Sequence, residues 1–172
     1  MRIILEDTRQ QAGKHAHVNA WFAEHGIEVR RTKLFVGDYT LPTDQTVCVD
    51  TKYGLQEVYG NLIGAEHERF IREAKAAQET GIKLIVLVEQ HGIRDVNEVC
   101  RWQNPRIARY ERIKAGKIVG GYRNVTQASK PPVSSEQLMR TMQTVSRRYG
   151  IDWMFCDKSR TAGVIAEILG IL

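Results

Sequence analysis

Residues 37–52 read GDYTLPTDQTVCVDTK, a pattern that predicts two short strands joined by a tight turn. The runs on either side have strand-like composition, and the PTDQ segment between them is rich in residues that turns favour. A strand alternates its side chains between two faces, so we expect Asp50 and Lys52 on one face and the neighbouring valines on the other. Pairing of the two strands would bring Asp38 to the same end. The stretch therefore predicts that two carboxylates and one ammonium group converge.

This group of side chains suits metal-assisted hydrolysis of a phosphodiester bond. Mg²⁺ prefers oxygen ligands and is often held by one or two carboxylates together with water and substrate phosphate. Asp38 and Asp50 are the candidate catalytic metal ligands, with the backbone carbonyl of Thr51 as a further ligand, and Mn²⁺ could replace Mg²⁺. Lys52 is a candidate catalytic residue, because an ammonium group can orient water and stabilise transition-state charge. The simpler alternative is an ordinary turn beside an exposed ion pair between Asp50 and Lys52.

The segments around this stretch alternate between strand-like and helix-like patterns. Further strands are predicted at residues 2–7, 27–36, 83–89 and 152–156. Helices are predicted at residues 15–25, 56–80 with a break near 60–64, 105–115, 135–149 and 160–169. Asn104, Ser134 and Ser159 are the expected N-caps of the last three helices. This mixture predicts an α/β fold with a mixed central sheet flanked by helices.

The length of 172 residues argues for a single domain over residues 1–172. Its expected parts are core motifs in residues 3–90, a basic and partly irregular segment in 90–133, and a helix–strand–helix unit in 134–172. The apolar run after Met1 is too short for a signal peptide, and no apolar run of membrane-spanning length follows. We therefore expect a cytoplasmic protein without a membrane partner. The three cysteines lack metal-binding spacing and are expected to be reduced thiols.

Positive charge is concentrated in one part of the chain. Residues 101–130 contain eight basic residues and one acidic residue, whereas the whole chain has a net charge of only +5. Such a flank suits contact with nucleic acid phosphates, although a solvated helix face would have the same pattern. We expect Trp102 and Tyr110 to belong to the core. The candidate DNA-binding residues of this segment are Arg101, Arg106, Arg109, Arg112 and Lys114, and Lys117 and Arg123 belong to the same segment.

Four motifs occur in an order that is typical of one nuclease family: LEDTRQ at 5–10, KLFVGDY at 33–39, CVDTK at 48–52 and KLIVLVE at 83–89. Together they resemble the XPF-type nuclease domain of structure-specific DNA endonucleases, within the PD-(D/E)XK superfamily. HERF at 67–70 is similar to the arginine-bearing helix of that family. The remainder of the chain is similar to stand-alone phage or prophage members. The resemblance implies a restriction-endonuclease-like fold, in a bacterial cell or a phage-infected host.

The resemblance also implies roles for individual residues. Asp38 and Asp50 would bind the metal, Lys52 would be the catalytic lysine, and Asp7 and Arg9 would line the site as further catalytic residues. Arg69 would contact phosphate or the active site, whereas we expect Glu73 on a solvated face of the same helix.

The chain departs from the family pattern at three places. Gln10 replaces a glutamate, Thr51 replaces an arginine, and Gln56 stands where an aspartate is usual, with Glu57 next to it as a possible substitute. These changes permit a weakened site but keep two acids and a lysine.

The function expected on these grounds is that of a Mg²⁺-dependent endonuclease that cuts branched or flapped DNA in repair or recombination. A homodimer or a partner nuclease subunit is the expected assembly. Two alternatives remain open: a catalytically silent DNA-binding or scaffold subunit that keeps the nuclease fold, and a Holliday-junction resolvase.

Overall fold

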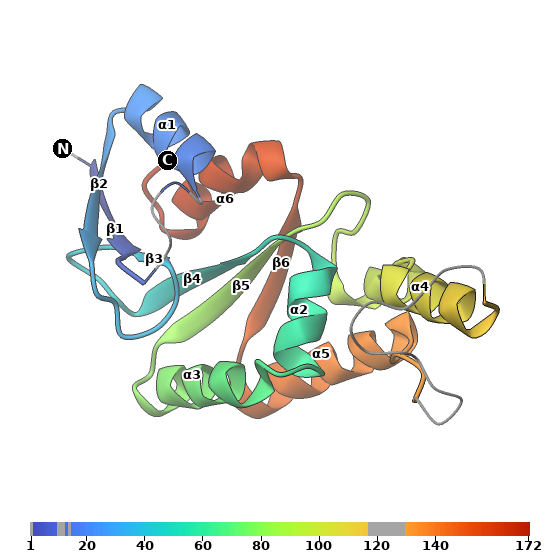
Figure 1. Cartoon of the computed structure of the whole chain (residues 1–172). Helices are drawn as coiled ribbons and strands as arrows, with labels where there is room; N and C mark the ends of the chain where they lie inside the picture. Colours follow the sequence, from blue (N-terminus) through green and yellow to red (C-terminus); the bar gives the residue numbers. More distant parts are fainter. Residues whose placement is uncertain (1, 10–12, 14, 117–129) are drawn as a thin grey trace.

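The computed structural model describes residues 2–9, 13, 15–116 and 130–172 of the chain. Its strands are β1 (Arg2–Asp7), β2 (Ile27–Thr32), β3 (Tyr39–Thr40), β4 (Val47–Lys52), β5 (Lys83–Glu89) and β6 (Asp152–Cys156). They form one sheet in the order β2-β1-β3-β4-β5-β6 (Figure 1). Strand β3 is antiparallel to both neighbours, whereas all other pairs are parallel. The predicted α/β class with a mixed central sheet is confirmed.

Helices cover both faces of this sheet. One face carries α1 (Ala16–Glu24) and α6 (Thr161–Ile168), and the other carries α2 (Leu55–Leu62), α3 (His67–Glu79) and α5 (Ser135–Tyr149) (Figure 1). Between β5 and α5 the chain forms the 3₁₀ helix η1 (Val96–Arg101) and α4 (Pro105–Lys114), and the 3₁₀ helix η2 (Lys158–Arg160) precedes α6.

Strand alternation divides the interior into two apolar cores. Cys48 of β4 and Val86 of β5 pack into the core beneath α2, α3 and α5. Val49 and Leu87 are the next residues along the same strands, and they pack into the core beneath α1 and α6. Strand β5 is therefore apolar on both sides, which explains its continuous apolar sequence.

The stretch from Gly37 to Lys52 forms the predicted antiparallel pair, with Tyr39 opposite Val49. Gly37 has a φ of 71°, a conformation that side chains with a Cβ rarely adopt. A Cβ at this position would lie 3.1 Å from the carbonyl oxygen of Val49 and 3.2 Å from Cβ of Cys48. The turn therefore packs directly on β4, which a larger residue would prevent.

Two predictions of element boundaries are wrong. Strand β2 ends at Thr32 rather than at residue 36, because residues 33–38 form an irregular segment with a bend at 35–38, from which Leu34 and Val36 are buried. Ser159 does not cap α6; it lies within η2, and the N-cap position is occupied by Arg160 without a side-chain cap bond.

Other local predictions are confirmed. The break in the long helical region separates α2 from α3, and the N–H of Gly64 donates to the carbonyl of Gly60 at 3.1 Å. Asn104 and Ser134 accept hydrogen bonds from the first turns of α4 and α5 as expected of N-caps. None of the described helices combines the length and apolarity that crossing a membrane requires.

Candidate active site

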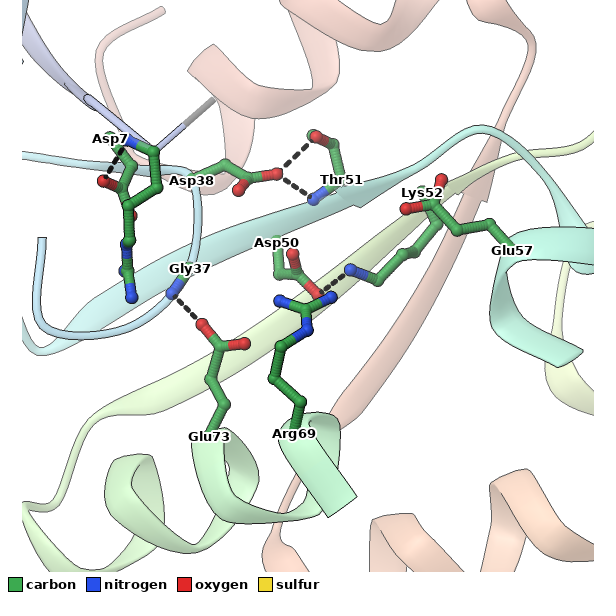
Figure 2. Close-up of a pocket in the computed structure, with 10 residues that line it drawn as sticks. Asp7, Gly37, Asp38, Asp50, Thr51, Lys52, Glu57, Arg69 and Glu73 are labelled. Carbon is green, nitrogen blue, oxygen red and sulfur yellow. Dashed lines mark hydrogen bonds and ion pairs between the residues drawn. The ribbon is translucent and has the colours of Figure 1, made fainter. Parts of the chain in front are cut away.

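A polar cavity of about 300 Å³ opens beside the ends of β1 and β4 and the start of α3 (Figure 2). Five carboxylates and three basic side chains line it, so its lining is acidic overall. Such a balance favours a bound cation, while the basic groups suit phosphate. Its lining residues are Asp7, Arg9, Gly37, Asp38, Asp50, Thr51, Lys52, Glu57, Arg69 and Glu73.

The backbone around Asp38 joins the strands that carry the acids. The N–H of Asp38 donates to the carbonyl of Val49 on β4 at 2.7 Å. Its carbonyl accepts from the N–H of Asp7 on β1 at 2.9 Å. These bonds hold residues that are far apart in sequence side by side. The predicted hairpin brings Asp38 close to Asp50, and Asp7 lies beside them, as the family resemblance implied.

The carboxylate of Asp38 is held by Thr51. Its Oδ2 accepts from the backbone N–H of Thr51 at 2.8 Å and from Oγ1 of Thr51 at 2.6 Å (Figure 2). Asp38 is buried, so these two bonds fix its orientation. Thr51 lacks the charge of the arginine that is usual in the family, but its hydroxyl has a clear structural role. The proposed use of its carbonyl as a metal ligand stays a prediction.

Asp50 and Lys52 form a buried ion pair, with Oδ2 of Asp50 2.6 Å from Nζ of Lys52. Both side chains are almost inaccessible to solvent, so the alternative of an exposed ion pair on a solvated face is wrong. Apart from this contact, no described residue donates a hydrogen bond to that oxygen. A buried, sparsely bonded carboxylate oxygen has capacity for a further cationic partner.

Burial and charge act on both members of this pair. Burial raises the pKa of Asp50, Lys52 opposes this effect, and Asp38 and Glu73 reinforce it. Burial alone would lower the pKa of Lys52, but the carboxylates of Asp50 and Asp38 raise it above its ordinary value. The charge of each group affects the other, because Lys52 retains its proton most firmly when Asp50 is ionised. The charged pair is the relevant state, because opposite charges lie 2.6 Å apart and a divalent cation would also favour ionised Asp50.

Asp7 and Arg9 occupy the cavity wall at the end of β1. Arg9 donates from Nε to Oδ2 of Asp7 at 2.6 Å and from its backbone N–H to Oδ1 at 2.9 Å. Its Nη2 donates to the carbonyl of Leu34 at 3.1 Å. The bond to Asp7 raises the pKa of Arg9. The guanidinium is half exposed and oriented by these contacts, so it can meet a phosphate that enters the cavity.

The family pattern suggested Glu57 as a replacement for a missing aspartate, and Glu57 does line the cavity. Its Oε2 accepts from the N–H of Tyr53 at 2.8 Å. Gln56 is exposed and does not line the cavity. Gln10, the third departure from the family pattern, lies outside the described residues.

The prediction that Glu73 lies on a solvated helix face is wrong. Glu73 is half-buried on α3, lines the cavity, and its Oε1 accepts from the N–H of Gly37 at 2.9 Å (Figure 2). Arg69 stands one helical turn earlier and also points into the cavity, where Figure 2 shows it beside Asp50. Arg69 keeps an exposed ion pair with Glu66, which raises its pKa. The four-residue spacing from Arg69 was the sequence signal that could have identified Glu73.

The side chains present fit Mg²⁺ or Mn²⁺. Within the described parts of the chain, no three His, Cys, Asp or Glu side chains form a group that could hold a metal ion by itself. Two carboxylates completed by water and phosphate oxygens are nevertheless a usual ligand set for Mg²⁺. Asp38 has one oxygen that is not engaged by Thr51, and Asp50 lies on the adjacent strand.

The basic residues predicted to contact DNA divide into two groups. Arg69 lines the cavity, whereas those of η1 and α4 lie apart from it (Figure 1). Arg106 stacks on the ring of Tyr59 at 4.9 Å, and Arg101 pairs with Glu98 at 3.4 Å. The residues of the second group are Arg101, Arg106, Arg109, Arg112 and Lys114, and all of them are exposed.

Of the two aromatic residues expected in the core, Trp102 packs against it, but Tyr110 lies on α4, which has no buried residue. Lys117 and Arg123 fall outside the described residues.

Comparison with known proteins gives one family and two similar structures. The model of the ERCC4 domain matches residues 7–168. XPF from Aeropyrum pernix in complex with DNA has 19% sequence identity and a TM-score of 0.61, covering 99% of this chain and 64% of the XPF chain. A second structure of XPF from Aeropyrum pernix has 19% identity and a TM-score of 0.57, with 97% and 63% covered. A search of curated protein sequences finds no significant match. The chain thus shares the XPF nuclease fold and spans a little under two thirds of these two proteins.

Proposed function

Because the chain belongs to the ERCC4 domain family, a family of DNA nucleases, we propose that it is a metal-dependent endonuclease that cuts branched or flapped DNA. The observation that carries this proposal is the convergence of the buried side chains of Asp38, Asp50 and Lys52 in one acidic cavity. An acidic cavity that also presents arginines suits a phosphodiester accompanied by a divalent cation.

The proposed division of labour follows from the contacts of each side chain. Asp38 and Asp50 would hold Mg²⁺, or Mn²⁺ in its place, and the bound ion would supply activation of water and compensation of the charge on the scissile phosphate. Thr51 keeps the Asp38 carboxylate in position through two hydrogen bonds. Lys52 is fixed by Asp50 and presents an ammonium group that can orient the attacking water.

The arginines of the cavity bind phosphate in this scheme. Arg9 is oriented by Asp7 and by the carbonyl of Leu34, which leaves part of its planar guanidinium exposed. Arg69 enters the cavity from α3. Two guanidinium groups from different elements would contact the DNA strand near the reacting phosphate and stabilise its developing charge.

Substrate binding beyond the cavity is assigned to the exposed basic residues of η1 and α4. They would contact backbone phosphates without reading sequence. A second copy of the chain or a partner nuclease subunit could add further contacts. DNA repair or recombination is the proposed setting, because branched and flapped DNA are the structures that such a nuclease would remove.

The test is a cleavage assay on end-labelled flap, fork, four-way-junction and linear duplex DNA, with Mg²⁺, with Mn²⁺ and with EDTA. Asp50→Asn and Lys52→Ala should abolish cutting. Asp44→Asn is the matched control, because Asp44 is an exposed acid in the β3–β4 connection that accepts hydrogen bonds from Thr46 and lies outside the cavity lining. Metal-dependent cutting of flaps that is lost in both site variants and kept in the control is the expected result.

Other outcomes would redirect the assignment. Binding of branched DNA without cutting in either metal would favour the silent scaffold subunit. Symmetric paired incisions in the four-way junction would favour a Holliday-junction resolvase. Undiminished cutting by Lys52→Ala would refute the proposed mechanism.

A further inference from the structure

Phe35 presents an aromatic ring to solvent at the edge of the candidate active site. The residue is 60% exposed, the highest value among the large apolar residues that the structure describes as exposed. The residues on either side, Leu34 and Val36, are 4% and 1% exposed. The chain is thus anchored on both sides of Phe35, and the ring between the anchors packs into neither core.

The backbone that carries Phe35 is held by side chains and strands of the site itself. The carbonyl of Leu34 accepts from Arg9, the N–H of Gly37 donates to Glu73, and the N–H of Asp38 donates to β4. Gly37 lines the cavity and lies two residues from Phe35, so their Cα atoms are at most about 7 Å apart. The backbone of Phe35 is therefore held close to the rim of the cavity.

The surroundings of the ring are cationic rather than apolar. Lys33 is exposed on the same segment, and the half-exposed guanidinium of Arg9 bonds to the residue before Phe35. A hydrophobic protein interface would need a contiguous apolar patch, and the neighbouring residues of the segment are buried or charged. An aromatic ring among phosphate-binding cations is instead the arrangement that binds single-stranded nucleic acid, in which bases stack and phosphates pair with basic groups.

We propose that Phe35 forms a stacking site for an unpaired nucleobase next to the phosphate in the cavity. This inference rests on the proposed nuclease function and assigns a determinant of its substrate class. A base that is paired in a duplex already stacks on its neighbours and cannot offer its face to the ring. A base at a flap or fork is free to do so, and Phe35 thereby favours DNA that is unpaired at the cutting position.

The inference predicts how affinity depends on one base. Binding is measured in EDTA, so that no cutting occurs, on a flap, on a matched duplex, and on flaps in which single unpaired nucleotides near the branch are abasic. Phe35→Ala should weaken binding to the intact flap about 5- to 150-fold, the range expected for loss of one stacked base. One abasic position should weaken binding of the parent protein by a similar factor and leave Phe35→Ala without a further loss.

Matched variants separate stacking from other effects. Phe35→Trp should retain flap affinity, because it keeps an aromatic face. Met154→Ala should match the parent protein, because Met154 is a partly exposed apolar residue on β6, at an edge of the sheet away from the site. Thermal unfolding of Phe35→Ala should resemble that of the parent protein, because the ring contributes little buried surface.

The failure of this inference is distinct from failure of the proposed function. If the parent protein cuts flaps but Phe35→Ala binds intact and abasic flaps as the parent does, the stacking site is refuted and the nuclease assignment stands. Equal loss of affinity for flap, duplex and abasic DNA would also overturn it, since the ring would then only support the loop. A change in oligomeric state of Phe35→Ala, with DNA affinity unchanged, would assign the ring to a protein contact instead.

Discussion

Glu73 offers the sharpest test of how this cavity is organised, because its inferred role depends on one contact. Its carboxylate accepts the hydrogen bond from the N–H of Gly37 at 2.9 Å and thereby holds the turn that carries Asp38. Glu73→Ala removes the acceptor and leaves a half-buried N–H without its partner. Glu73→Gln keeps an oxygen in the same place and removes only the charge.

The structure sets the size of both effects. A hydrogen bond to a charged group contributes about 2 kcal/mol, and a neutral one about 1 kcal/mol. Glu73→Ala should therefore destabilise the protein by about 2 kcal/mol, which lowers Tm by about 4–8 °C for a chain of this length. If the full loss also reaches the transition state through misplacement of Asp38, cleavage falls by up to about 30-fold. Glu73→Gln should cost about 1 kcal/mol and at most about 5-fold in rate.

The measurements are thermal unfolding and single-turnover cleavage of flap DNA at saturating protein. Glu79→Ala is the control, because Glu79 is exposed on the same helix and lies outside the cavity. Equal stability and equal rates for Glu73→Ala and the parent protein would refute the positioning role. If Glu73→Gln kept its stability but lost cleavage as completely as Glu73→Ala, the charge of Glu73 would be required, and Glu73 would be a metal ligand rather than a positioning residue.

Three further predictions address the turn, the basic helix and the metal. Gly37→Ala should destabilise the protein by about 2 kcal/mol or more and should exceed the effect of Gly92→Ala, because both glycines have positive φ but only Gly37 packs against Val49; equal effects in thermal unfolding would exclude the close approach as the cause. Joint neutralisation of Arg106 and Arg109 should weaken DNA binding and reduce the slope of log affinity against log salt by about 2, and an unchanged slope would remove them from the DNA-binding surface. Addition of Mg²⁺ to protein treated with EDTA should raise Tm, because the cation relieves repulsion among the carboxylates of the cavity. The absence of a Tm shift at millimolar Mg²⁺, or an equal Tm shift in Asp50→Asn, would contradict the assigned ligands.

Much of the fold could be predicted because its central elements have unambiguous patterns. Strand β5 is predicted with its observed ends, since burial on both faces keeps residues 84–88 apolar between Lys83 and Glu89. The end of β2 could not be predicted. Leu34 and Val36 are buried and lie two residues apart, and an irregular segment that is anchored at alternate residues has the same spacing as a strand.

The site was predictable where local geometry determines it. Alternation along β4 places Asp50 and Lys52 on one face, and this follows from two residues of separation alone. Glu73 depends on the packing of α3 against the Gly37 turn, and a helix rich in charged residues gives no indication of which carboxylate faces inward. The hydrogen bonds from Thr51 to Asp38 also depend on tertiary structure, so the substitution of a usual arginine by threonine could not be interpreted from the sequence.

The hydrogen bonds around Asp38 also supply a way to observe the assembly of the site without DNA or metal. The amide protons of Asp7, Gly37, Asp38 and Thr51 are all donated across this one turn, to partners on different segments of the chain. Their exchange with solvent deuterium should therefore slow together when the acids are in place. The exchange rates of these four amides would then show whether the catalytic centre is formed in a given preparation, variant or complex.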